Sequence, residues 1–276
     1  PEPAPAAQVS SPPPSIDGGA EPVNIDEKID LVASVNLDAP VDGAILQQAL
    51  LQLPWFDKPV RWYALDEAGM PYRSALVDRR QHGQTRPDYK RLNPVGRIPA
   101  LETPQGPIFE TAACLLWIAE TSGHFAPAPQ DAGRPGFLKW LFFLSNTLHA
   151  EMRMLFYPEK YAPGAEQTLR DQVAQNIDGH LALLAQAVTA CDGFSAAEAK
   201  TPLITDLYLA VLLRWPALYP RGGTAWYRLT TYPSLAALAA RIETRPSMAR
   251  AMIAEGLGPT PLTAPHYPSP PEGSAL

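Results

Sequence analysis

The chain has 276 residues, of which 46% are apolar, and its formal net charge is −6. This length and composition allow one large or two modest folded domains with a real core. The acidic balance, without a basic stripe, argues against a nucleic-acid partner. No apolar run approaches the roughly 20 residues of a membrane span, which argues against a membrane partner. The two cysteines, Cys114 and Cys191, are far apart, so we expect neither a disulfide framework nor a metal site.

Both ends of the chain are rich in proline and small residues. Such segments bury too little apolar surface to offset their ordering entropy, so we predict a largely disordered extension over 1–46 and a disordered tail over 263–276. Within the extension, the run IDLVASVNL (residues 29–37) could form a short strand. The first residues, PEPAPAAQVS, lack the basic and apolar regions of a secretory signal. With only two cysteines, the chain fits a reducing compartment, and we predict a cytoplasmic protein.

Residues 47–124 have the pattern of a small mixed sheet with helices packed on it. The predicted strands are Gln48–Leu53, Tyr72–Asp78, Pro99–Glu102 and Pro107–Phe109. A helix opens at Pro59 and ends at Gly69, because proline suits a first helical turn and glycine a helix end. Another helix opens at Thr111, after the hairpin turn TPQG. The resulting order, βαβ followed by ββα, predicts a sheet covered by helices.

A linker over 125–134 separates this part from residues 135–262, which we predict to be entirely helical. One long helix should run from Phe137 to Tyr157 and end at Pro158. The run LITDLYLAVLLRW (residues 203–215) is apolar on nearly all sides, which indicates a buried central helix.

Four segments in this order resemble the cytosolic glutathione S-transferase family, most closely its bacterial beta-class members. They are YALDEAGMPY at 63–72, NPVGRIPALETPQGPIFETAACLLWIAE at 93–120, WLFFLSNTLHAEMRMLF at 140–156 and YPSLAALAARIETRPSMARAM at 232–252. The resemblance covers roughly residues 48–255. It implies an α/β plus all-α fold, with an N-terminal thioredoxin-like domain followed by a C-terminal all-helical bundle. It also implies a homodimer, and it gives Asp206 the role of the buried acid that caps the central helix.

The resemblance implies a glutathione site around Pro99. Proline is unusual at the start of a strand, because it has no backbone N–H to donate to the neighbouring strand. A cis Ile98–Pro99 bond, which costs only about 0.5–1 kcal/mol relative to trans, would turn the Ile98 backbone toward the cysteinyl part of glutathione. The Thr111 hydroxyl and the helix N-terminus would bind the γ-glutamyl carboxylate. Glu110 would receive the γ-glutamyl ammonium, and Arg97 (or alternatively His82) the glycyl carboxylate. By local chemistry alone, Pro99 could equally end a loop and Glu110–Thr111 form an ordinary cap.

The usual thiol activator is missing. A free thiol has a pKa of about 8.5, so the family places Ser, Cys or Tyr after the first strand to favour thiolate. Here that stretch is LPWFDKPVRW, and alignments put Asp57, or Trp55 and Phe56, at that position. None of these carries a hydroxyl or a thiol. The candidate catalytic residues are therefore the Trp55 indole N–H and His149, which stands where beta-class members keep a histidine facing the sulfur.

Two functional interpretations follow. The first is a glutathione transferase that uses glutathione as co-substrate to conjugate, reduce or isomerise a hydrophobic electrophile, a detoxification reaction that needs no metal. The second is a non-catalytic glutathione-binding or scaffold protein on the same fold, and the missing activator favours it.

Overall fold

The computed structural model describes residues 33–34, 59–72, 77 and 82–268. The strands are β1 (Ala33–Ser34), β2 (Ala100–Thr103) and β3 (Gly106–Phe109). The α-helices are α2 (Pro59–Glu67), α3 (Pro87–Leu92), α4 (Thr111–Ser122), α5 (Arg134–Phe143), α6 (His149–Phe156), α7 (Glu166–Thr189), α8 (Ile204–Arg214), α9 (Pro233–Glu243) and α10 (Pro246–Glu255). None of these helices is both long and apolar enough to cross a membrane.

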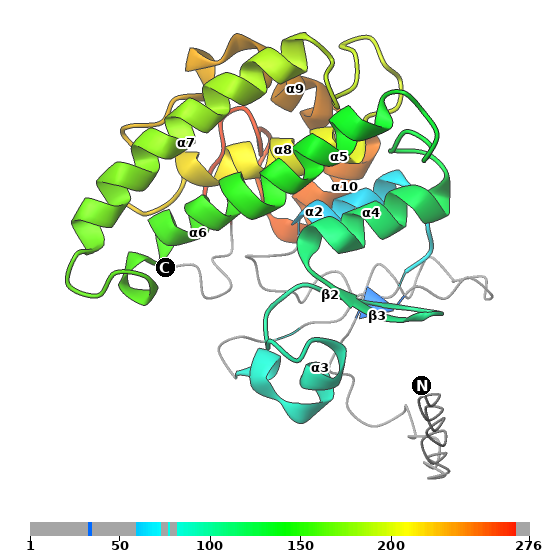
Figure 1. Ribbon diagram of the computed structural model, residues 1–276, viewed down its shortest axis with the longest axis horizontal. Coiled ribbons are helices and arrows are strands. Elements are labelled where there is room, and N and C mark those ends of the chain that lie inside the picture. Colours follow the sequence, from blue (N-terminus) through cyan, green and yellow to red (C-terminus); the bar gives the residue numbers. More distant parts are fainter. Residues whose placement is uncertain (1–32, 35–58, 73–76, 78–81, 269–276) are drawn as a thin grey trace, which may run out of the picture.

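A small sheet and two layers of helices form the N-terminal half (Figure 1). β2 and β3 make an antiparallel hairpin in which Leu101 pairs with Ile108. β1 lies parallel to β2, with Ala33 opposite Leu101. Helices α2 and α4 lie side by side between the sheet and the helical half, and α3 packs on the other side of the sheet (Figure 1).

Most local predictions for this half that fall on described residues are confirmed. β2 and β3 occupy the two predicted hairpin strands, α2 begins at Pro59 and α4 begins at Thr111. Gly69 follows α2 with a φ of 62°, a left-handed conformation that favours glycine. The run at 29–37 contributes β1. The strand predicted at Gln48–Leu53 lies outside the described residues, as does most of the strand predicted from Tyr72 to Asp78.

The long helix predicted from Phe137 to Tyr157 is interrupted by a wider turn. A π-helical turn over Leu144–Leu148 joins α5 to α6, and the helical segment starts earlier, at Arg134. Turns of this kind are rare and occur often at functional sites. The sequence pattern missed this turn because the apolar spacing on either side of it is that of an ordinary helix.

The centre of the helical half is α8, as predicted. Every residue of α8, from Ile204 to Arg214, is buried. Asp206 is also fully buried and its carboxylate accepts the N–H of Leu203 at 2.7 Å, which satisfies an orphan donor at the helix start. The same carboxylate lies 3.5 Å from the Arg241 guanidinium of α9.

Polar contacts join α2 to the last helix, so the two halves are fixed to each other. The Glu67 carboxylate is almost fully buried and accepts hydrogen bonds from Arg245 and Ser247. The Tyr63 hydroxyl donates to the Ile242 carbonyl at 3.3 Å. These contacts fix α2 against α9 and α10.

Candidate functional site

A cavity of about 890 Å³ lies between the two halves. Arg97, Ile98, Pro99, Glu110 and Thr111 line it from the sheet half. His149 lines it from the helical half. The fold thus gathers six of the seven predicted site residues around one space, and the seventh, Trp55, lies outside the described residues.

The loop before β2 is held by one buried amide. Asn93 is 3% exposed, and its Nδ2 donates to the Arg97 carbonyl at 2.6 Å while its Oδ1 accepts the Val95 N–H at 3.0 Å. The Tyr89 hydroxyl donates to the same Arg97 carbonyl at 2.7 Å. The Ile98–Pro99 bond is cis, as predicted. The sequence analysis missed Asn93; its place just before a proline in a loop was the available signal.

The other wall on this side is the start of α4. Thr111, Ala112 and Ala113 line the cavity, and the first turn of α4 contains no acidic residue. Free N–H groups at a helix start carry positive potential and favour an anion. Glu110, just before the helix, has a φ of 71°. This conformation is strained for a residue other than glycine, and such strain concentrates at functional sites.

His149 is part of an aromatic cluster on the opposite wall. Its Nδ1 lies 2.7 Å from the hydroxyl of Tyr208, a fully buried residue of α8 that also lines the cavity. The Trp215 ring centroid lies 5.0 Å from that of His149. Sequence analysis did not find Tyr208, because an aromatic residue in an apolar helix has the pattern of a core residue.

The surroundings of His149 favour its neutral form. Burial, followed by the positive charge of Arg153, lowers the pKa of His149 to about 4. Burial, followed by the charge of Glu110, raises the pKa of the Tyr208 phenol, which therefore stays protonated. At neutral pH both groups are uncharged and serve as hydrogen-bonding groups.

Since the folded state disfavours the imidazolium form of His149, this residue is expected to lower the free energy of unfolding in acid. The unfolded chain takes up a proton near pH 6.5 and the folded chain only near pH 4. Stability should therefore fall as pH drops through this window and become constant below it. The ring is partly exposed, so we expect a loss of roughly 1–2 kcal/mol between about pH 7.5 and pH 5. Urea unfolding at both pH values tests this, and in His149→Gln the pH-dependent loss should shrink by that amount. An equal loss in both proteins would contradict the assignment.

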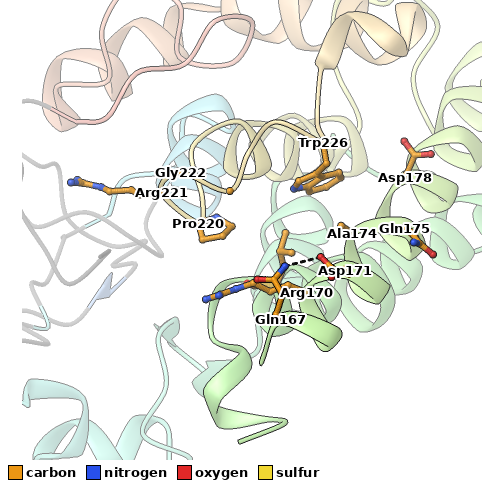
Figure 2. Close-up of a pocket in the computed structure, with 12 residues that line it drawn as sticks. Gln167, Arg170, Asp171, Ala174, Gln175, Asp178, Pro220, Arg221, Gly222 and Trp226 are labelled. Atoms are coloured by element: carbon orange, nitrogen blue, oxygen red, sulfur yellow. Dashed lines mark hydrogen bonds between the residues drawn. The ribbon is translucent and has the colours of Figure 1, made fainter. Parts of the chain in front are cut away.

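A second cavity, of about 930 Å³, lies between α7 and the loop that leads to Trp226 (Figure 2). Several of its polar side chains already have partners. Gln167 donates to Asp171 at 2.7 Å, and Asp178 accepts from the Tyr232 hydroxyl. The Arg221 guanidinium lies over the Tyr267 ring, 4.3 Å from its centroid. None of the predicted site residues lines this cavity, so the first cavity is the candidate site.

Among the described residues, no group of three or more His, Cys, Asp or Glu side chains could hold a metal ion. The described residues that line the candidate site supply a helix N-terminus, one acid, a neutral imidazole and several cations.

Residues 61–121 match the sequence profile of the glutathione S-transferase N-terminal domain. Glutathione S-transferase GST-4.5 of Xanthomonas campestris pv. campestris is 30% identical to the chain over 163 residues, which cover 56% of this chain and 74% of that protein. The chain belongs to the glutathione S-transferase family. The family resemblance predicted from the four sequence segments is thereby confirmed.

A solved glutathione S-transferase from a sphingomonad, in complex with glutathione, superimposes with a TM-score of 0.58 and 27% identity. The match covers 74% of this chain and 96% of that transferase, and it confirms the predicted thioredoxin-like half followed by a helical half. Other relatives are longer. The probable elongation factor 1-gamma 2 of Arabidopsis thaliana is 29% identical over 135 residues, and the chain spans only 33% of its length.

Proposed function

We propose that this protein is a glutathione-dependent transferase, in which the sulfur of bound glutathione attacks a hydrophobic electrophile. The observation that supports this most is the single cavity lined by Arg97, Ile98, Pro99, Glu110 and Thr111 on one wall and His149 on the other. The charges of that cavity fit the charges of glutathione, a tripeptide with two carboxylates and one ammonium group.

Glutathione is proposed to lie along the sheet-side wall as an extended strand. Its γ-glutamyl carboxylate meets the Thr111 hydroxyl and the first N–H groups of α4, and its ammonium meets the Glu110 carboxylate. Ile98 presents its backbone to the cysteinyl residue, since no described residue hydrogen-bonds to its N–H or C=O. Arg97 is exposed at the edge of the cavity, where it meets the glycyl carboxylate.

His149 is proposed to act as a hydrogen-bond donor and not as a base. A pKa of about 4 makes it a weak base at neutral pH. The buried Tyr208 O–H has no other acceptor among the described residues, so it donates to Nδ1. A neutral imidazole carries one proton, which is then on Nε2. No described residue accepts a hydrogen bond from this Nε2–H, so it can donate to the glutathione sulfur and favour the thiolate over the thiol.

Replacing Thr111 with alanine tests the binding mode. The change removes one hydrogen bond to a charged group, worth about 1.5 kcal/mol, so we expect glutathione to bind about 10-fold more weakly. Isothermal titration of the full chain with glutathione measures this. Thr111→Ser, which keeps the hydroxyl, is the matched control and should bind nearly as the wild type does. No detectable binding to the wild type at millimolar concentrations would refute the proposal.

The second candidate, a non-catalytic protein on this fold, rests on the stretch from Trp55 to Asp57, which contains no hydroxyl or thiol. The two candidates differ in the pKa of the bound thiol. A thiol pKa well below its ordinary value in the complex supports the transferase, and an unchanged one supports the binding protein.

Family membership supports two further expectations. We propose that the protein works as a homodimer and in the cytoplasm. Light scattering after size-exclusion chromatography should give twice the chain mass of 30.0 kDa.

A further inference from the structure

The helical wall of the candidate site contains an unexpected pair of cations. Arg153 of α6 and Lys160, in the turn after it, both line the cavity. Their side chains lie near the same aromatic ring. The Arg153 guanidinium is 5.7 Å and the Lys160 ammonium 4.3 Å from the centroid of Tyr157. An aromatic face attracts cations, so the ring holds two like charges near each other.

Neither cation has an ion-pair partner among the residues that the structure describes. The ion pairs between described residues do not include Arg153 or Lys160. Arg153 donates its Nε–H to the Tyr161 hydroxyl at 2.8 Å, which fixes the guanidinium without adding a negative charge beside it. Two cations on one wall, with no ion-pair partner in the described part of the chain, attract anions into the cavity.

These cations lie close to the proposed reacting centre. Arg153 stands four residues after His149 in α6, so both side chains project from the same face of the helix. The charge of Arg153 contributes to lowering the pKa of His149, so its field reaches the imidazole. Apolar side chains from Leu116, Phe142 and Met154 line the same cavity, and Phe142 is 49% exposed.

We propose that the part of this cavity that binds the electrophile selects molecules that combine an aromatic or apolar body with an oxyanion such as a carboxylate. Leu116, Phe142 and Met154 contact the body, and Arg153 and Lys160 bind the oxyanion. This inference rests on the proposed transferase function and specifies its substrate class. The arginine is the stronger element, because a guanidinium can hold a carboxylate with two parallel hydrogen bonds.

Two chloroarenes that differ mainly in charge test the proposal: 4-chloro-3,5-dinitrobenzoate and its methyl ester. In both, the glutathione sulfur forms a bond to the ring carbon, the C–Cl bond breaks, chloride leaves with the electron pair and the thiol proton goes to solvent. Each kcat/KM is divided by the rate constant of the uncatalysed reaction with glutathione, which removes the difference in intrinsic reactivity. We expect a larger ratio for the carboxylate, and this advantage should shrink at high salt.

Variants then assign the selectivity to residues. Arg153→Gln should raise KM for the carboxylate substrate about 10-fold, as expected for the loss of one charge-assisted contact. The KM for the ester should stay within about twofold of the wild-type value. Lys160→Gln should act in the same direction but more weakly, since this side chain is exposed. Arg153→Lys should restore part of the preference. Lys200→Gln removes an exposed cation outside the cavity and should leave KM unchanged for both substrates.

The outcomes separate the two levels of inference. Equal ratios for both substrates, together with equal effects of Arg153→Gln on both, would overturn the substrate class and leave the transferase function standing. A raised KM for glutathione in Arg153→Gln, with the acceptor KM unchanged, would also overturn it, because the cation would then bind the tripeptide. If neither substrate reacts and glutathione does not bind, the proposed function and this inference both fail.

Discussion

His149→Leu is expected to lower kcat about 100-fold, because it removes the Nε2–H donor proposed to stabilise the glutathione thiolate. Leucine fills a similar volume beside Trp215, whose ring centroid is 5.0 Å from that of the imidazole, so the fold should survive. The measurement is kcat at saturating glutathione with 1-chloro-2,4-dinitrobenzene. The ultraviolet absorbance of the thiolate gives the thiol pKa, which should rise toward its ordinary value.

Three variants distinguish a donor from a packing residue at this position. His149→Gln keeps an N–H donor and should recover part of the rate. His124→Leu replaces an exposed histidine outside the cavity and should have no effect. If His149→Leu changes neither kcat nor the thiol pKa, the imidazole only packs against its aromatic neighbours.

Tyr208 acts through His149 and is therefore a positioning residue. In Tyr208→Phe the imidazole loses the hydroxyl 2.7 Å from its Nδ1, and either ring nitrogen can carry the proton. The loss of rate should be smaller than in His149→Leu, and the pH profile should gain an inflection because the neutral imidazole is less favoured. A loss of stability with an unchanged pH profile would instead indicate a purely structural residue.

Asp206→Ala is expected to lower the free energy of unfolding by about 3–5 kcal/mol. The carboxylate is fully buried, and it accepts the N–H of Leu203 at 2.7 Å and that of Ser195 at 3.3 Å. Its removal leaves these donors without partners and leaves the Arg241 cation, 3.5 Å away, uncompensated. The loss falls on α8, which packs against α2, α4, α5 and α9.

Urea denaturation of the variant at neutral pH measures this effect, with the change in midpoint read at constant slope. Asp206→Asn keeps one acceptor oxygen and should lose less stability than alanine does. Asp171→Ala removes an exposed carboxylate from α7 and should change stability by no more than about 0.5 kcal/mol. A loss below about 1 kcal/mol in Asp206→Ala would mean that water replaces the carboxylate as acceptor.

Local sequence signals predicted the hairpin and the helix start at Thr111 that carry the candidate site, because turn and cap residues act over a short range. The role of Pro99, Glu110 and Thr111 in binding glutathione came only from the family resemblance and stays a prediction. Trp55 stays a prediction, since it lies outside the described residues. His149 was found only through the family resemblance, because a lone histidine on a helix has no pattern of its own.

The sequence by itself determined the family, through the resemblance of four segments. It also determined the β2–β3 hairpin, the start of α4 and the burial of α8, since these depend on periodicity and on residues close together in the chain. Only the tertiary structure paired Tyr208 with His149, which are 59 positions apart, and so indicated which ring nitrogen carries the proton. It also placed Arg153 and Lys160 over one tyrosine ring and on the wall of the same cavity as Glu110. Contacts of this range arise from the packing of whole helices, and the charge balance of a cavity depends on which side chains that packing brings together.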